Sequence, residues 1–244
     1  MVIDGLILCE GETDQALLSY YLGRVRGWKY IRLKDMPFPT ERICWYQDAN
    51  NRVMGIWPVG CNDFLGVLSK VFEMEKIEHR VKKIAIVTDN DDNSTESVRI
   101  KQLFSGLNDM VMFNGFDDQM YKDANNKWIS LEFESAFGKA LIEVTYLLVP
   151  FDKHGALETF MLSALSENDE DKKMVISKIK KFIDNAAFEK YLRKRRQRIK
   201  AELGMSVAVF TPDKVFSEMD ELIMSVDWER FDITNKQFEI LKDI

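Results

Sequence analysis

Two groups of acidic residues follow apolar runs that have the composition of buried strands. Glu10 and Asp14 lie just after VIDGLILC, and Asp89 and Asp91 lie just after KKIAIVT. Carboxylates about 4 Å apart repel each other by roughly 4 kcal/mol at an effective dielectric near 20, so a cluster of them requires protons or a counter-charge. A divalent cation supplies that charge, and all-oxygen ligands favour Mg²⁺, Mn²⁺ or Ca²⁺. The two groups predict a metal site, provided that they meet in the fold.

The surrounding pattern predicts three strand-to-helix units in succession. Short runs rich in Val, Ile and Leu indicate strands, and apolar residues at helical spacing indicate helices. The expected strands cover residues 2–10, 52–60 and 82–88, and the expected helices cover residues 13–27, 62–80 and 94–106. Asn62 or Asp63 is the expected N-cap of the second helix. Such units predict parallel strands in an α/β sheet, and ligands bind at the carboxyl edge of such sheets.

The pattern changes after about residue 107. Residues 109–115, 127–137 and 140–149 have strand-like composition, and residues 156–204 are almost wholly helical in pattern. Thr211 and Pro212 predict the start of a further helix, because proline suits the first helical position. We therefore expect an α/β domain with extra strands over residues 1–150 and a helical C-terminal lobe over residues 151–244, packed on it or forming one compact unit with it.

Composition limits the class of protein. The 244 residues are 46% hydrophobic and 30% charged, as in a globular protein, and the net charge of -6 argues against a surface coated with basic groups. Cys9, Cys44 and Cys61 lie far apart, so they predict neither a disulfide framework nor a structural zinc site. No run approaches eighteen apolar residues, and no signal peptide is recognisable. We expect a cytoplasmic protein with no membrane partner.

The order of the acidic motifs resembles the TOPRIM domain of topoisomerases, bacterial primases and several nucleases. LILCEGETD resembles the strand that ends in Glu-Gly with an acid three residues after the glycine, and IAIVTDNDD resembles the strand that ends in Asp-x-Asp. Glu10, Asp89 and Asp91 match that signature. Between them, only Gly60 and Asn62 match the Gly-Gly-Lys-x-Asn turn of related nucleases. The resemblance implies a TOPRIM (Rossmann-like) parallel sheet flanked by helices.

A later segment resembles nucleases of the OLD (overcoming lysogenization defect) type and stand-alone bacterial TOPRIM proteins. DKHGALETFMLSAL resembles their segment with glutamate in a Gly-x-Leu-Glu context, and Glu158 matches an additional metal ligand. Asp14 matches the second acid of the first motif. The basic stretch YLRKRRQRIKAELG resembles the late Lys-x-Lys-like segment of those proteins, and Arg196 and Arg198 are the counterparts of its two lysines. The basic residues expected to contact nucleic-acid phosphates are Lys194, Arg195, Arg196, Arg198 and Lys200.

The resemblance implies a nuclease that hydrolyses phosphodiester bonds of DNA or RNA with two Mg²⁺ or Mn²⁺ ions, which requires about four or five carboxylates. Glu10 and Asp89 are the expected catalytic acids, and Glu10 is also a candidate general acid or base. Arg196 and Arg198 are expected to stabilise negative charge on phosphate. The implied metal ligands are Glu10, Asp14, Asp89, Asp91 and Glu158. The larger OLD enzymes carry an ATPase, and this chain lacks an ATP-binding loop, so a separate ATPase subunit is an expected partner. A homodimer is also expected, since it suits a protein that acts on two strands.

Each motif also has an ordinary structural interpretation. Glu12 and Asp14 suit the first turn of a helix, where the helix dipole favours acids. The residues from Asp89 to Ser94 suit a loop that caps a helix, Glu158 suits the solvent face of an amphipathic helix, and the basic stretch suits a solvated helix face. His154 is more simply a surface residue than a metal ligand.

Two other functions remain open. A phosphatase of the haloacid dehalogenase type also carries Asp-x-Asp after an apolar strand, and its first aspartate forms a covalent phosphoenzyme. That motif usually lies on the first strand, whereas here it lies on a later one. A non-catalytic TOPRIM module that binds nucleic acid or a partner protein is the other alternative, favoured by the incomplete middle turn.

Overall fold

The computed structural model describes residues 2–33, 38, 40, 42–60, 64–78, 80–90, 93–114, 126–151, 153–185, 190–214 and 218–244; the side chains of residues 93–97 are not described. The chain forms two compact units. The first unit contains residues 1–88, 92–148 and 240–244, and the second contains residues 89–91 and 149–239. The division near residue 149 lies one or two residues from the boundary expected from the sequence, and residues 240–244 belong to the first unit.

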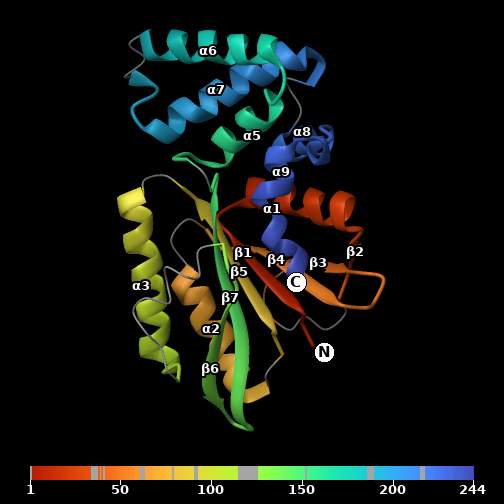
Figure 1. Ribbon diagram of the computed structural model, residues 1–244, viewed down its shortest axis with the longest axis vertical. Helices are drawn as coiled ribbons and strands as arrows, with labels where there is room; N and C mark the ends of the chain where they lie inside the picture. Colours follow the sequence, from red (N-terminus) through yellow and green to blue (C-terminus); the bar gives the residue numbers. More distant parts are fainter. Residues whose placement is uncertain are drawn as a thin grey trace. The chain divides into compact units, whose positions relative to one another are not determined.

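The first unit is built on a seven-stranded sheet with the order β2-β3-β4-β1-β5-β7-β6 (Figure 1). The strands are β1 (Gly5–Cys9), β2 (Lys29–Ile31), β3 (Cys44–Gln47), β4 (Val53–Pro58), β5 (Lys83–Asp89), β6 (Ile129–Ser135) and β7 (Gly138–Val149). β1 pairs in parallel with β4 on one side and with β5 on the other. β2, β3 and β4 pair antiparallel, as do β6 and β7. The predicted α/β class with parallel central strands is confirmed.

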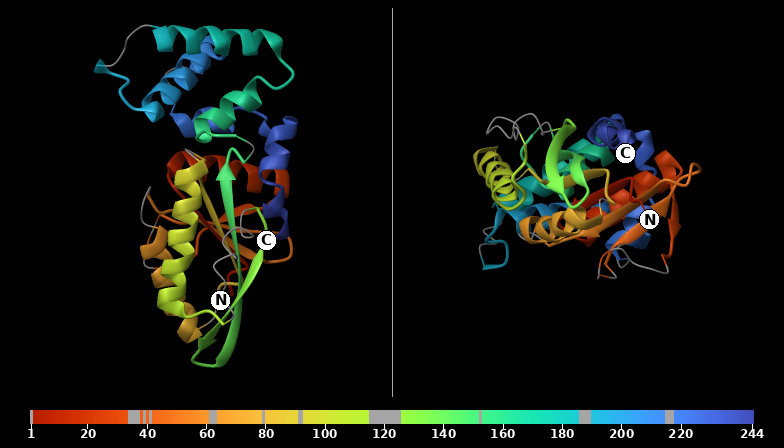
Figure 2. Two further views of the ribbon diagram at one scale, coloured as in Figure 1. Left: turned by 60° about the vertical axis from the view of Figure 1, so that its left-hand side comes forward. Right: turned by 90° about the horizontal axis from the view of Figure 1, so that it is seen from below.

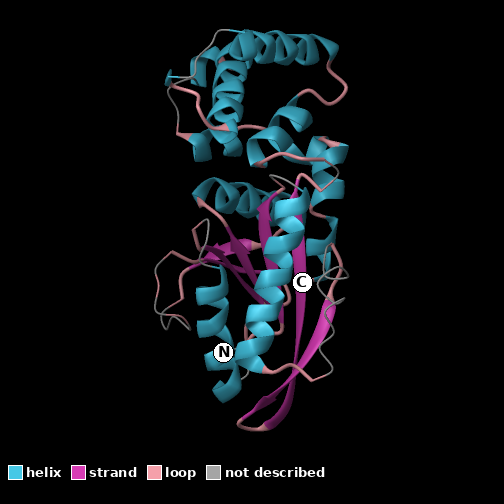
Figure 3. Ribbon diagram, turned by 90° about the vertical axis from the view of Figure 1, so that its left-hand side faces the viewer, coloured by secondary structure: helices cyan, strands magenta, loops and turns pink. Residues whose placement is uncertain are grey.

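The central strands are apolar along their whole length because both of their faces are covered. Every residue of β1 and β4 is buried. Leu6 and Leu8 belong to a core cluster that also holds apolar residues of α2 (Phe64–Glu78) and α3 (Asn93–Val111). Figure 3 shows these two helices in front of the sheet. Side chains of the other parity, such as Ile7, are also buried, and α1 (Glu12–Tyr20) packs against β4. A π-helical turn, η1 (Tyr21–Val25), continues α1.

The second unit is helical (Figure 2). Its elements are α5 (Leu157–Leu165), α6 (Glu170–Asn185), α7 (Arg195–Phe210), η3 (Pro212–Lys214), α8 (Met219–Met224), η4 (Trp228–Arg230) and α9 (Asp232–Gln237). α7 packs against both α5 and α6. Trp228 is fully buried, and its indole Nε1 donates a hydrogen bond to the carbonyl oxygen of Ile223 at 2.8 Å, so the buried polar atom is satisfied. A final short helix, η5 (Glu239–Asp243), begins in this unit and continues into the first.

Some local expectations are wrong. Residues 109–111 were expected in a strand, but α3 continues to Val111 because Leu107 and Val111 keep the helical spacing that buries them in the core. Thr211 is the C-cap of α7 rather than the N-cap of a new helix, and only a 3-10 turn follows at Pro212. β2 and β3 were not expected. Asn62 and Asp63 lie outside the described residues. Among the described helices, none combines the length and hydrophobicity needed to cross a bilayer.

Gly55 and Gly204 offer a matched test of the packing. A Cβ at Gly55 would lie 2.9 Å from Trp45 and 3.0 Å from Ile43, whereas a Cβ at Gly204, on the exposed side of α7, would have no neighbour within 4 Å. We expect Gly55→Ala to lower the free energy of unfolding by about 1–3 kcal/mol through overpacking. We expect Gly204→Ala to raise it by up to about 1 kcal/mol, because alanine favours the helix. Denaturant unfolding measures both, and equal effects would contradict the packing described here.

Candidate functional site

The first unit places Glu10 at the carboxyl edge of its sheet. β1 ends at Cys9, whose carbonyl oxygen accepts a hydrogen bond from Val59 at 2.9 Å. The carbonyl oxygen of Glu10 accepts one from Gly60, also at 2.9 Å. Gly60 has a φ of +88°, which glycine adopts without steric cost, so the turn after β4 closes beside the end of β1. The Glu10 side chain is only 6% exposed.

Asp14 has a structural role at the start of α1. Its Oδ2 accepts a hydrogen bond from the backbone N–H of Gly11 at 2.9 Å, which satisfies a donor ahead of the helix. The side chain is buried and lies in the first helical turn, where the helix dipole favours an acid. Burial, together with the charges of Asp14, Cys44 and Glu10, raises the pKa of the Cys9 thiol well above its usual value. Cys9 therefore stays protonated at neutral pH.

A cavity of about 320 Å³ lies beside Glu10 in the first unit. Thr88, at the end of β5, and Tyr146, on β7, line it, and their hydroxyl groups are 3.1 Å apart. Arg99 and Gln102 of α3 add polar groups, and Phe64 at the start of α2 adds an aromatic ring. The sequence interpretation missed these residues. The available signal was the presence of Thr88 and Tyr146 as polar side chains near the carboxyl ends of otherwise apolar strands.

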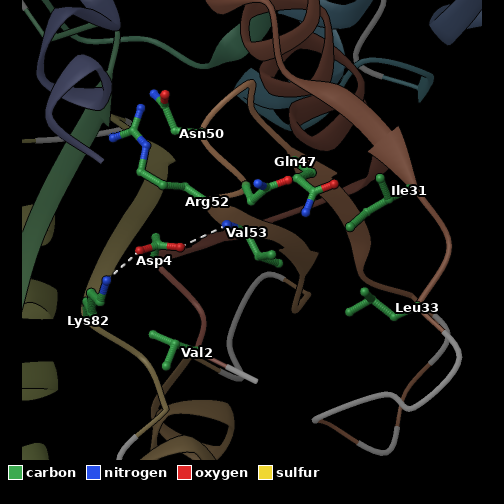
Figure 4. A pocket seen from close by; sticks show the side chains of 10 residues that line it. Val2, Asp4, Ile31, Leu33, Gln47, Asn50, Arg52, Val53 and Lys82 are labelled. Atoms are coloured by element: carbon green, nitrogen blue, oxygen red, sulfur yellow. Dashed lines mark hydrogen bonds and ion pairs between the residues drawn. The ribbon is translucent and has the colours of Figure 1, made fainter.

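A larger hollow of about 580 Å³ lies at the amino ends of the same strands (Figure 4). Its charged groups hold the fold together. Lys82 pairs with Asp4 at 2.6 Å, and Asp4 also accepts the backbone N–H of Val53 at 2.9 Å. Arg52 donates to the Asp48 carboxylate at 2.8 Å and to the main-chain oxygen of Ile244 at 2.8 Å. Ligands of parallel sheets bind at the carboxyl edge, so this hollow is the weaker candidate.

In the second unit, Asp89 lies at the start of α5. Its Oδ1 accepts the backbone N–H of Leu157 at 2.9 Å, and its Oδ2 is 3.3 Å from the guanidinium group of Arg196. Asp89 is 3% exposed. A buried carboxylate needs such partners, and the N-terminus of a nine-residue helix is a favourable place for negative charge.

Asn90 holds the loop that brings α5 to Asp89. Its side-chain amide donates to the carbonyl oxygens of Pro150 and Lys153 at 2.9 and 3.0 Å, and its main chain exchanges hydrogen bonds with Val149 and Gly155. Its Oδ1 is buried and has no hydrogen-bond partner within the part of the chain that is described. The sequence interpretation treated this residue only as the middle position of Asp-x-Asp.

The basic stretch is divided by the helical repeat of α7. Arg196 and Lys200, four residues apart, share a face, and Lys200 lies 3.6 Å from the Glu158 carboxylate on α5. Glu158 is 8% exposed, so it does not face solvent. Arg198 points elsewhere: it donates to the carbonyl oxygen of Leu192 at 3.1 Å and lies 3.8 Å from Asp184 on α6.

Lys194 and Arg195 are exposed at the start of α7, where the N–H of Lys194 donates to the Gln197 side chain at 3.0 Å. His154 is exposed. Asp91, a predicted metal ligand, lies outside the described residues. Across the described residues, no three Asp, Glu, His or Cys side chains form a group that could hold a metal ion.

The fold and this edge define an α/β protein with buried acids after two neighbouring parallel strands. Residues 4–241 match the family described as "Protein of unknown function (DUF3226)", and the chain belongs to that family. No curated protein matches the sequence. A crystal structure of hypothetical protein PH0156 from Pyrococcus horikoshii OT3 is similar to this chain at 15% identity and a TM-score of 0.48, over 94% of this chain and 99% of that one.

Asp48 gives a pH-dependent test of the turn beside the larger hollow. Burial alone would raise the pKa of Asp48, but hydrogen bonds from Arg52 and from the backbone N–H of Asn50 outweigh it and lower that pKa. A lowered pKa stabilises the fold above the unfolded pKa, near pH 4, and this contribution is lost as pH falls through the folded pKa. We expect Asp48→Asn to cost about 1–2 kcal/mol at pH 7 and less at pH 3. Urea unfolding at pH 7 and pH 3 measures the free energy that Asp48→Asn costs at each pH, with the exposed Asp109→Asn as the control. An equal cost at the two pH values would contradict the lowered pKa of Asp48.

Proposed function

We propose that this protein is a divalent-metal-dependent nuclease of the TOPRIM type, which hydrolyses phosphodiester bonds of DNA or RNA. The observation that carries the proposal is the pairing of β1 with β5. Cys9 pairs with Val87 in parallel strands, so β1 and β5 end at the same edge of the sheet: Glu10 directly follows β1, and Asp89 is the last residue of β5. Carboxylates at such an edge are the groups that metal-dependent phosphodiester hydrolysis requires.

The buried oxygen atoms near Asp89 suit a hard cation. Asp89 and Glu158 are buried carboxylates, and the Oδ1 of Asn90, which has no hydrogen-bond partner among the described residues, is a neutral oxygen ligand next to Asp89 in the chain. Oxygen donors of this kind favour Mg²⁺ or Mn²⁺. The ligands that the sequence predicts for this ion are Glu10, Asp14, Asp89, Asp91 and Glu158. When bound, the ion would polarise the phosphate and lower the pKa of a bound water.

The protein's own groups would supply the remaining chemistry. The Glu10 carboxylate, shielded from solvent, would accept or return the proton of the attacking water. The Arg196 guanidinium, which pairs with Asp89, would also bind a non-bridging phosphate oxygen through a charge-assisted hydrogen bond. Lys200, on the same face of α7, would contact a neighbouring phosphate. Arg198 is assigned no catalytic role, because it contacts Leu192 and Asp184.

The direct test is cleavage of plasmid DNA and of single-stranded DNA and RNA in Mg²⁺ or Mn²⁺. We expect Glu10→Gln and Asp89→Asn to reduce cleavage by at least about 100-fold, since each removes a charge that the reaction needs. Glu12→Gln is the matched control, because Glu12 is an exposed glutamate two residues from Glu10. It should leave cleavage unchanged.

Cleavage that survives both substitutions would reject the proposed centre. Release of phosphate from small monoesters, without cleavage of polymers, would favour the phosphatase. A separate ATPase subunit and a homodimer stay predictions. Cleavage that increases when ATP and cell extract are added would support the ATPase subunit.

A specific observation favours the second candidate, a non-catalytic nucleic-acid-binding module. Arg196 and Lys200 already pair with Asp89 and Glu158, and the described residues contain no ready group of metal ligands. A module of this kind would bind nucleic acid through the face of α7 that carries Arg196 and Lys200. Asp89 and Glu158 would then only hold these two cations in position.

Substitutions in α7 test which cations contact nucleic acid. We expect Arg196→Gln and Lys200→Gln each to reduce the dependence of log K on log salt by about one, because each removes a phosphate contact. Arg198→Gln is the matched control and should leave the slope unchanged while lowering stability. Fluorescence anisotropy of a labelled oligonucleotide at several salt concentrations provides the measurement. If only Arg198→Gln changed the slope of log K against log salt, the assignment of Arg196 and Lys200 to the nucleic-acid-binding face of α7 would be contradicted.

A further inference from the structure

The cavity beside Glu10 has the size and the mixed lining of a binding site for a small ligand. It lies between α3, the start of α2 and the carboxyl ends of β1, β5 and β7, all in the first unit. Its volume of about 320 Å³ is at the lower end of the range for ligand pockets, which is roughly 300–1,000 Å³. A cavity of this size suits one ring system rather than an extended ligand.

The walls of the cavity combine apolar surface with polar groups at defined positions. Phe64, Leu65 and Leu103 supply the apolar surface, and Leu65 is 37% exposed at this edge. Arg99, Gln102 and Leu103 occupy positions i, i+3 and i+4 of α3, which places them on one face of the helix. This face brings a cation, an amide and an apolar side chain to the same cavity.

The polar groups differ in chemistry. The hydroxyl groups of Thr88 and Tyr146 form one hydrogen-bonded pair, which presents both donor and acceptor capacity. The Gln102 amide has a donor and an acceptor side by side, the arrangement that reads the edge of a nucleobase. The Arg99 guanidinium suits a phosphate or the face of an aromatic ring.

We propose that this cavity receives a single unpaired nucleobase of the nucleic-acid substrate. The proposal rests on the proposed function and specifies its substrate class, namely strands that present a base outside a duplex. The base lies between the Phe64 ring and the leucine side chains, its polar edge meets Gln102 and the Thr88–Tyr146 pair, and its own phosphate lies toward Arg99. Stacking on an aromatic side chain accepts every base, so the site selects an unpaired nucleotide rather than a sequence.

A base within a duplex cannot enter such a cavity without losing its stacking and pairing, which costs a few kcal/mol. Single strands and frayed ends avoid that cost. The cavity therefore explains why an enzyme with a net charge of -6 would recognise nucleic acid, since contact with one base adds affinity that phosphate contacts alone do not give.

The test is binding of nucleoside 5′-monophosphates in EDTA, measured by calorimetry, with ribose 5-phosphate as the base-free comparison. We expect a purine nucleotide to bind at least about fivefold more tightly than ribose 5-phosphate, the smallest effect typical of one stacked base. Phe64→Ala, which removes the stacking partner, and the cavity-filling Leu103→Trp should abolish this preference, and Gln102→Ala should weaken it. Lys101→Ala, an exposed position on the same helix that does not line the cavity, is the control and should retain it.

Equal affinity for the nucleotide and the base-free sugar phosphate, or no binding of either, would overturn the proposal. Inorganic phosphate that binds as tightly as the nucleotide would likewise show that Arg99 holds an anion only. Gln102→Ala gives an answer if Leu103→Trp fails to fold. Because EDTA removes metal, this result does not depend on cleavage: base-selective binding without cleavage would reject the nuclease alone, and cleavage without base selectivity would reject the cavity assignment alone.

Discussion

The central constraint on this structure is that a buried carboxylate must have compensating partners. Asp89 ends a strand of apolar residues and is almost wholly removed from water, so its charge would be prohibitively costly without them. The N–H of Leu157 and the guanidinium of Arg196 provide the compensation. Within the second unit, the start of α5 and one face of α7 are therefore tied to Asp89. The same principle applies to Glu158 and Lys200, one helical turn further along α7.

The pairing of Arg196 and Lys200 with acids separates the roles of the cations in residues 190–200. In the sequence these cations look equivalent, and all of them suit contact with phosphate. On α7 they separate into Arg196 and Lys200, which meet acids of the candidate site, and Arg198, which joins α7 to α6. A cation that already neutralises an acid is also well placed to neutralise a phosphate, so the structural and functional roles of Arg196 are compatible.

The two edges of the sheet have different chemistry. At the amino ends, Asp4 pairs with Lys82 and accepts the N–H of Val53, and Arg52 binds the main-chain oxygen of Ile244. At the carboxyl ends, Glu10, Thr88 and Tyr146 surround a cavity. The parallel strands β1, β4 and β5 produce this asymmetry because they present the same end at one edge, and the loops that follow are free to carry polar residues. The proposed base-binding cavity lies at that second edge, beside Glu10.

The amino-acid sequence by itself determined the class of fold and the residues that end its central strands. The apolar runs at residues 2–10, 52–60 and 82–88 predicted β1, β4 and β5 and their parallel direction, since such runs are stable only when buried on both faces. Which of these strands are neighbours was left to the structure, in which β1 pairs with both of the others. The sequence could not give β2 and β3, which are short, or the end of α3, where burial of Val111 prevails over local strand preference.

Only the tertiary structure decided which side chains meet. Asp14 turns back to Gly11, Arg196 reaches Asp89, Arg198 does not, and Gln102 and Tyr146 come together from elements far apart in the chain. The physical reason is that residue order fixes local periodicity, and hence the burial of each face, whereas a contact between distant polar groups depends on how those faces pack.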